Sequence, residues 1–162
     1  TRPMTVWHVP AGMPDGESPH ERAQQVLANA ETCTLATVSP DGRPEAATVR
    51  FVADDTLDVY ITTESTYRKY HNMTQNPSVA LVVDGRYNLQ LEGTASEIHD
   101  RTVDWFKRQY TETYGQSEYL TDDDSVFFRV TTDWARLLVD GSFPPAFEMV
   151  IGDGEADPHG ST

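Results

Sequence analysis

A period of two dominates the sequence from Thr32 onward, where apolar and polar residues alternate in short segments between turn residues. This alternation is typical of β-strands that bury one face. The clearest turn, Pro40-Asp41-Gly42-Arg43, combines a proline that fixes its own backbone angle with a glycine that is free to adopt positive φ. We therefore predict an antiparallel hairpin with strands over residues 32–39 and 45–52, and a mainly β fold.

Five more segments carry strand signals. They cover residues 57–62, 79–83, 88–98, 126–132 and 134–139. Residues 79–83 are apolar at every position, which predicts a strand buried on both faces. Gly93 predicts a bulge or bend in its strand, and a tight corner is expected near Asp133.

Helix signals flank these strands. Ser18-Pro19-His20-Glu21 combines an N-cap serine, a proline at the first helical position and a capping-box glutamate. Further helices are predicted over 66–75 and 100–114, and the polar residues 115–125 are expected to form an exposed loop. Six or seven short strands with two or three helices predict an antiparallel barrel with helical covers. The expected organisation is an irregular N-terminal arm (1–17), one barrel domain (18–141) and a partly disordered C-terminal tail (142–162).

The formal net charge of -14 argues against nucleic acid or an anionic membrane as a partner. It fits either a protein adapted to high salt or an ordinary acidic cytoplasmic protein. Cys33 is the single cysteine, so neither an intramolecular disulfide nor a cysteine metal cluster can form. The sequence contains no run of apolar residues long enough to span a membrane and no signal-peptide core, which predicts a cytoplasmic location.

The sequence contains no motif that indicates a metal site or a hydrolase. The histidines are scattered without a ligand spacing, and Asp122-Asp123-Asp124 lacks the central glycine of a calcium loop. The sequence contains no nucleophile elbow, Walker motif or dinucleotide-binding glycine pattern. We predict no metal site, and we identify no catalytic residue.

One stretch, from Tyr60 to Tyr70, combines a strand exit with the start of a helix. Arg68 and Lys69 lie in the first helical turn, in a chain with two lysines and 26 acidic residues. A helix N-terminus presents unpaired N–H groups and the positive end of its dipole, which together suit a phosphate. The alternative is a capped surface helix whose cations are only solvated.

A third cation, Arg50, lies in an otherwise apolar strand, where a charge is costly unless it meets an anion. If the second and third strands pair, Arg50 approaches the strand exit and could join Arg68 and Lys69 at one phosphate. The alternative is that Arg50 pairs with Glu45, Glu64 or a surface aspartate.

Several segments together resemble the pyridoxamine-phosphate-oxidase-like split-barrel flavoproteins. They are Thr34 to Val52, Tyr60-Ile61-Thr62-Thr63, Arg68-Lys69, Asn76 to Val83 and Leu89 to Gly93, and the resemblance extends over residues 32–136. It implies a split β-barrel of six to seven antiparallel strands. It also implies a homodimer that binds FMN at two sites in the subunit interface and exchanges electrons with a small-molecule donor or acceptor.

The resemblance assigns cofactor-binding roles to nine residues. By this resemblance, the residues that bind the flavin phosphate are Arg50, Arg68 and Lys69. The residues that line the isoalloxazine are Phe51 and Val52. The strand-exit pair is Thr62 and Thr63. A polar residue that reaches the flavin edge from the partner is Asn88 or Gln90.

The sequence departs from this family at the end of the barrel. Pyridoxamine-phosphate oxidases carry an Arg-Leu-His-Asp-Arg signature that grips the vitamin phosphate, whereas this chain reads Arg136-Leu-Leu-Val-Asp140. We therefore expect a flavin-dependent oxidoreductase of unidentified substrate rather than a vitamin oxidase. The alternatives are a deazaflavin-dependent reductase, a non-enzymatic flavin protein, a haem protein with His71 as an axial ligand, and a cofactor-free interaction module.

Overall fold

The computed structural model describes residues 17–153, which fold into one curled antiparallel sheet with helical covers. The sheet has eight strands in the order β2-β1-β5-β6-β7-β4-β3, and β8 pairs with β7. The strands are β1 (Thr32–Val38), β2 (Pro44–Arg50), β3 (Val52–Ala53), β4 (Val59–Glu64), β5 (Ser78–Val83), β6 (Asn88–Glu97), β7 (Ser125–Asp140) and β8 (Ala146–Ile151). The mainly β split barrel expected from the sequence is therefore confirmed.

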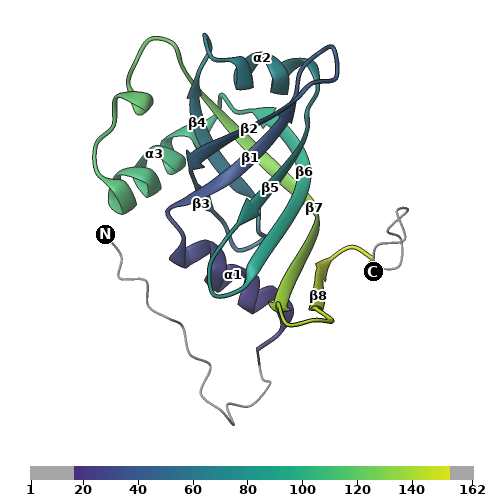
Figure 1. The fold of residues 1–162 in the computed structure, drawn as a ribbon. Helices are drawn as coiled ribbons and strands as arrows, with labels where there is room; N and C mark the ends of the chain where they lie inside the picture. The colour runs from purple at the N-terminus through teal and green to yellow at the C-terminus, as the bar shows by residue number, and fades with distance from the viewer. Residues whose placement is uncertain (1–16, 154–162) are drawn as a thin grey trace.

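Three α-helices cover the barrel: α1 (Pro19–Asn29), α2 (Arg68–Gln75) and α3 (Arg101–Tyr114). Figure 1 shows α1 at one end of the curled sheet, α2 at the opposite end and α3 against its outside. The capping box predicted at the start of α1 is present, because the Ser18 side chain accepts from the Glu21 N–H and Glu21 accepts from the Ser18 N–H. Within the described residues, no helix has the length and apolar character needed to cross a membrane.

The hairpin of β1 and β2 forms as predicted, but its second strand is shorter than the expected 45–52. The strand stops at Arg50, and Val52 and Ala53 belong to β3, which pairs with β4 instead. Phe51 thus lies at the point where the chain stops pairing with β1 and begins to pair with β4. Its side chain is 2% exposed in the core, and its carbonyl accepts a 2.6 Å hydrogen bond from the Tyr114 hydroxyl.

The two strands expected on either side of Asp133 are one continuous strand, so the predicted corner is wrong. The pairing of β7 with β6 shifts register between Glu92 and Gly93, which leaves Asp133 as the extra residue of a bulge. The bulge predicted at Gly93 is confirmed. A Cβ on Gly93 would lie 2.2 Å from the Thr131 carbonyl oxygen, so the close approach of the two strands requires glycine.

The interior of the barrel holds the main core. Its side chains come from alternate positions on the strands, with Ala23, Val26 and Leu27 of α1 and Met73 of α2 closing the ends. The prediction that residues 79–83 are buried on both faces is wrong for this chain. Val79, Leu81 and Val83 are buried, whereas Ala80 and Val82 are partly exposed on the outer side of the sheet.

Strand β8 was not predicted, since residues 142–162 were expected to form a tail. It pairs with the second half of β7, and Arg22 of α1 holds Glu148 of β8 through hydrogen bonds of 2.9 and 2.7 Å. The barrel domain therefore continues past its expected end at residue 141. Most of the expected N-terminal arm and the end of the expected tail lie outside the described residues.

A second cluster of apolar side chains lies between α3 and the outer side of β4 and β7. Its buried members are Tyr60, Phe106, Tyr110, Leu120 and Phe127. Leu120 belongs to a short 3₁₀ helix, η1 (Glu118–Leu120), within the segment predicted to be an exposed loop. That segment is therefore anchored to the barrel at one point, although most of its residues are exposed.

Candidate functional site

The start of α2 has the features of an anion site. The chain leaves β4 at Glu64 and enters the helix at Arg68, with Tyr67 as the N-cap residue. No side chain among residues 17–153 caps this helix, so the first N–H groups of α2 lack the acceptor that Ser18 supplies to α1. Uncapped N–H groups at a helix start favour an anionic ligand.

Two cations flank these N–H groups. The Arg68 side chain is 84% exposed, and its Nε lies 3.1 Å from a carboxylate oxygen of Glu45. The Lys69 ammonium lies 5.0 Å from the centre of the Tyr67 ring. Partial burial lowers the pKa of Lys69, and the neighbouring Glu45 acts against this effect. Glu45 is thus the carboxylate that lies beside both cations.

The two threonines at the strand exit have different environments. The Thr62 hydroxyl donates to the Tyr119 carbonyl at 2.6 Å, which ties η1 to β4. Thr63 is 1% exposed, and its hydroxyl has no hydrogen-bond partner among the described residues. A buried hydroxyl without a partner costs roughly 1–3 kcal/mol, so Thr63 is a candidate for contact with a bound molecule.

Arg50 and Arg68 have different partners in the structure. The Arg50 guanidinium lies 5.2 Å from the centre of the Tyr114 ring, at the end of β2, whereas Arg68 is bound to Glu45 near the start of the same strand. Arg50 lies five positions after Glu45, or about 17 Å along the extended strand. The ion pair considered between Arg50 and Glu45 is absent from the described residues, because Glu45 pairs with Arg68.

The remaining predicted residues lie elsewhere. Phe51 points into the core, so it can meet a ligand only through its backbone, and Val52 packs against the cluster beneath α3. Asn88 and Gln90 lie on β6, opposite Leu138 and Arg136 of β7.

The long strand β7 shows how far Gln90 lies from the strand exit. Thr62 lies opposite Phe127 of β7, whereas Gln90 lies opposite Arg136. These two β7 residues are separated by nine positions, or about 30 Å of strand. Within one chain the predicted site residues therefore form two separate groups.

Sequence reasoning missed the groups that surround the helix start. Tyr67 and Tyr119 join their hydroxyls at 2.9 Å, and Glu45 binds Arg68. Tyr67 precedes the Arg68-Lys69 pair directly, which is a signal that could have been used. Tyr119 and Glu45 come from distant segments and carry no such signal.

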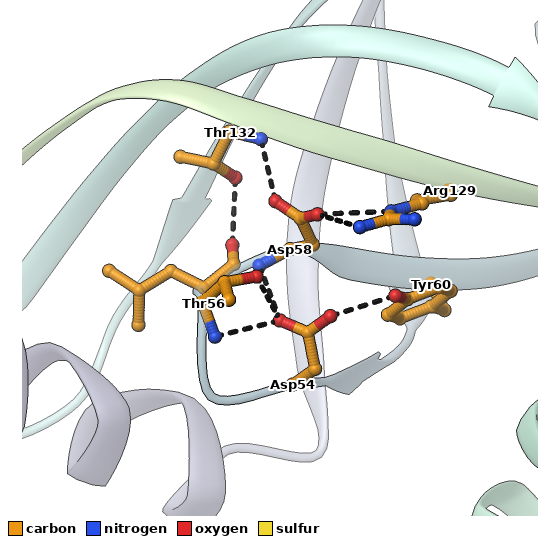
Figure 2. Close-up of polar contacts among 7 residues, drawn as sticks. Asp54, Thr56, Asp58, Tyr60, Arg129 and Thr132 are labelled. Carbon is orange, nitrogen blue, oxygen red and sulfur yellow. Dashed lines mark hydrogen bonds and ion pairs between the residues drawn. The ribbon is translucent and has the colours of Figure 1, made fainter.

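A second polar cluster lies at the turn between β3 and β4 (Figure 2). The Asp58 carboxylate is buried and accepts from Arg129 at 3.0 and 2.6 Å and from the Thr132 N–H at 3.0 Å. Asp54 accepts from Thr56, from the Asp58 N–H and from the Tyr60 hydroxyl.

The cluster at the β3–β4 turn serves to hold the fold. Burial acts to raise the pKa of Asp54, but the hydrogen bonds from Thr56, Tyr60 and Asp58 together lower it. Burial and the bond to Asp54 raise the pKa of Tyr60. Both carboxylates are occupied by partners within the chain, so this cluster offers no free group for a ligand.

Within residues 17–153, no group of three or more histidine, cysteine, aspartate or glutamate side chains could hold a metal ion. His71 is exposed on α2 beside Tyr70, with 5.5 Å between their ring centres.

A curled antiparallel sheet closed by helices at its ends defines a split-barrel protein. The family model described as pyridoxamine 5'-phosphate oxidase matches residues 19–138. The chain therefore belongs to the pyridoxamine 5'-phosphate oxidase family, as the sequence resemblance indicated. No curated protein matches the sequence at a significant level.

Solved structures with the same fold are distant in sequence. HutZ, the haem storage protein from Vibrio cholerae, is 20% identical with a TM-score of 0.60, over 68% of this chain and 87% of that one. A haem-binding protein from Mycobacterium smegmatis is 14% identical with a TM-score of 0.72, over 83% and 58% of the two chains. An F420 reductase is 24% identical with a TM-score of 0.59, over 76% and 98%.

Proposed function

We propose that this protein binds FMN and acts as a flavin-dependent oxidoreductase, with the cofactor phosphate at the start of α2. The observation that carries the proposal is the uncapped helix start with Arg68 and Lys69, in a chain of net charge -14 that belongs to the pyridoxamine 5'-phosphate oxidase family. When bound, the flavin supplies hydride or single-electron transfer, and the protein supplies anchoring and orientation.

The donor groups fit a phosphate. The helix N–H groups, the Arg68 guanidinium and the Lys69 ammonium can each donate to its oxygens, and charge-assisted bonds of this kind are about twice as strong as neutral ones. Arg68 must release Glu45 to take part, so the ligand replaces one carboxylate with a more highly charged group. The unpartnered hydroxyl of Thr63 is one further donor near the strand exit.

A second copy of the chain is part of this proposal. Gln90 and Asn88 are too far along the sheet to reach a ligand at their own strand exit, so they contribute only if a partner brings them there. The surface suited to such a partner is the outer face, which we define by the outward side chains of the strands from β2 to β8. Its members are Thr34, Ala36, Ala46, Thr48, Ala80, Val82, Asn88, Gln90, Glu92, Trp134, Arg136, Leu138 and Phe147.

The charge of the outer face supports association with another copy. Glu92 is the one acidic residue in this set, and Asp140 at the end of β7 lies at its edge, although the chain has 26 acidic residues. Two molecules that each carry a net charge of -14 repel one another unless they meet through a surface with few carboxylates. Small and apolar side chains at Ala36, Ala80 and Val82 also permit close approach.

The absorption spectrum of the purified protein, with and without added FMN, tests the proposed cofactor. We expect stoichiometric flavin binding with flavin absorption bands. Two of the similar structures are haem proteins and one is an F420 reductase, so haem and F420 are the matched comparisons. A Soret band with haem, or tight binding of F420 in place of FMN, would overturn the FMN assignment, as would a colourless protein that binds none of them.

The proposed interface predicts the effect of a charge at its centre. Val82→Glu should place a carboxylate in the dimer contact at a cost of about 2 kcal/mol, which raises the dimer dissociation constant roughly thirtyfold. Size-exclusion chromatography with light scattering measures this shift. Gln116→Glu, which adds the same charge at an exposed loop position, is the control. If Val82→Glu associates like the wild type, the outer face is not the interface.

A further inference from the structure

Gln90 and Arg136 form a fixed pair on the outer face. They lie directly opposite each other on β6 and β7, and the Gln90 Oε1 accepts from Arg136 Nε at 3.2 Å and from Nη2 at 2.8 Å. A guanidinium has donors and no acceptor, so the atom that faces it must be the amide oxygen. The Gln90 amide can therefore present only its NH₂ group to a molecule that lies on the outer face.

Two aromatic rings hold the Arg136 guanidinium in place. Its central carbon lies 4.1 Å from the centre of the Phe147 ring and 5.4 Å from that of Trp134. Phe147 belongs to β8, which lies beyond residues 19–138 that match the family model. Stacking of this kind restricts the rotation of the guanidinium and preserves the geometry of its two hydrogen bonds.

The charge of Arg136 has no counter-charge beside it in the described part of the chain. Among residues 17–153, no carboxylate lies within ion-pair distance of Arg136, whereas Arg22, Arg68 and Arg129 each have one. Glu92, the acidic member of the outer face, lies opposite Trp134 rather than Arg136. The pair thus combines an oriented amide donor with a nearby positive charge.

We infer that Arg136 is a positioning residue that fixes Gln90 as a hydrogen-bond donor toward an acceptor atom of the ligand held by the second copy. This inference rests on the proposed function, in which that ligand is FMN. A donor amide suits a carbonyl oxygen or an unprotonated nitrogen of the isoalloxazine. Through its charge, Arg136 also favours the more electron-rich reduced form of the flavin.

The Arg136–Gln90 bond can be tested first without any cofactor. In ligand-free protein, Arg136→Met should shift the side-chain amide resonances of Gln90 in a ¹⁵N NMR spectrum, because it removes both donors to Oε1. Arg86→Met is the matched control, since Arg86 also stacks on a ring, at 5.6 Å from Tyr87, and its loss changes the charge equally. Unchanged Gln90 resonances in Arg136→Met would overturn the inference.

The effect on the cofactor is tested in FMN-loaded protein. Arg136→Met should raise the FMN dissociation constant about tenfold, as expected for one lost hydrogen bond. It should also lower the flavin midpoint potential by about 30 mV. For two electrons this shift corresponds to a tenfold change in the ratio of the affinities for reduced and oxidised flavin. Arg136→Lys, which keeps the charge and one donor, should recover most of the potential, and Arg86→Met should change neither quantity.

Gln90→Glu separates the donor role from a structural one. A glutamate keeps the contact with Arg136 but presents no N–H, so folding should be unchanged while FMN binding weakens at least as much as in Arg136→Met. Wild-type FMN affinity in Gln90→Glu would overturn the donor role and leave the proposed function intact. Absence of FMN binding in the wild type would overturn both.

Discussion

Replacement of Arg68 and Lys69 together by alanine should weaken FMN binding by about 3 kcal/mol, which raises the dissociation constant more than a hundredfold. Both cations lie in the first turn of an uncapped helix, and the described residues around them supply one counter-charge, Glu45. In a chain of net charge -14, loss of these two charges leaves the phosphate facing mainly negative groups. Titration of the apoprotein followed by flavin fluorescence measures the change.

The matched control for the Arg68 and Lys69 variant is Lys107→Ala combined with Arg108→Ala. This pair removes the same two charges from the middle of α3, where no helix N–H groups are free. We expect the control to bind FMN within about twofold of the wild type, since Arg108 is exposed and Lys107 lies over the Phe127 ring at 5.3 Å, so that the N–H groups and both cations of α2 are kept. Equal affinities of the Arg68-Lys69 variant and the wild type would refute the phosphate anchor at α2.

The local signals in the sequence predicted the parts of the fold that depend on neighbouring residues. The turn at residues 40–43, the capping box at Ser18 and the bulge at Gly93 all appear in the structure. Each is decided within a few residues of chain or by a single special backbone requirement. The cationic helix start at Arg68 and Lys69 belongs to the same group.

Features that depend on distant segments could not be predicted in this way. Asp133 carries the signal of a corner, but Gly93 on the neighbouring strand lets β7 continue through a bulge. The strand break at Phe51 occurs because β3 pairs with β4, and no residue near Phe51 indicates this change of pairing partner. Strand β8 depends on β7 and on the contact of Arg22 with Glu148, which are separated by 126 positions.

The candidate site divides in the same manner. The sequence identified the cations at α2, whereas Glu45 and Tyr119 reach the site only through the tertiary fold. The distance between the strand exit and Gln90 emerges only from the pairing along β7. That distance is what makes a second copy necessary to the proposed function.

Asp58→Ala should lower the free energy of unfolding by about 3 kcal/mol. Asp58 is 5% exposed and is the common acceptor for Arg129 and for the Thr132 N–H, so its removal leaves the buried Thr132 N–H and the Arg129 guanidinium without this partner (Figure 2). Breaking a buried ion pair costs roughly 3–5 kcal/mol. The Arg129 side chain is 43% exposed and regains water in the variant, which places the expected loss at the low end of that range.

The position of Asp58 explains why its loss should extend beyond one ion pair. The Thr132 hydroxyl donates to the Leu57 carbonyl at 2.7 Å, and Leu57 adopts a φ of 69°, which is unfavourable for a branched side chain. Asp58 and Thr132 together hold this turn against β7. Asp55→Ala, at an exposed position of the same turn, is the control and should change stability by less than about 0.5 kcal/mol. Equal denaturation midpoints for the two variants in urea would show that the buried carboxylate does not hold the β3–β4 turn.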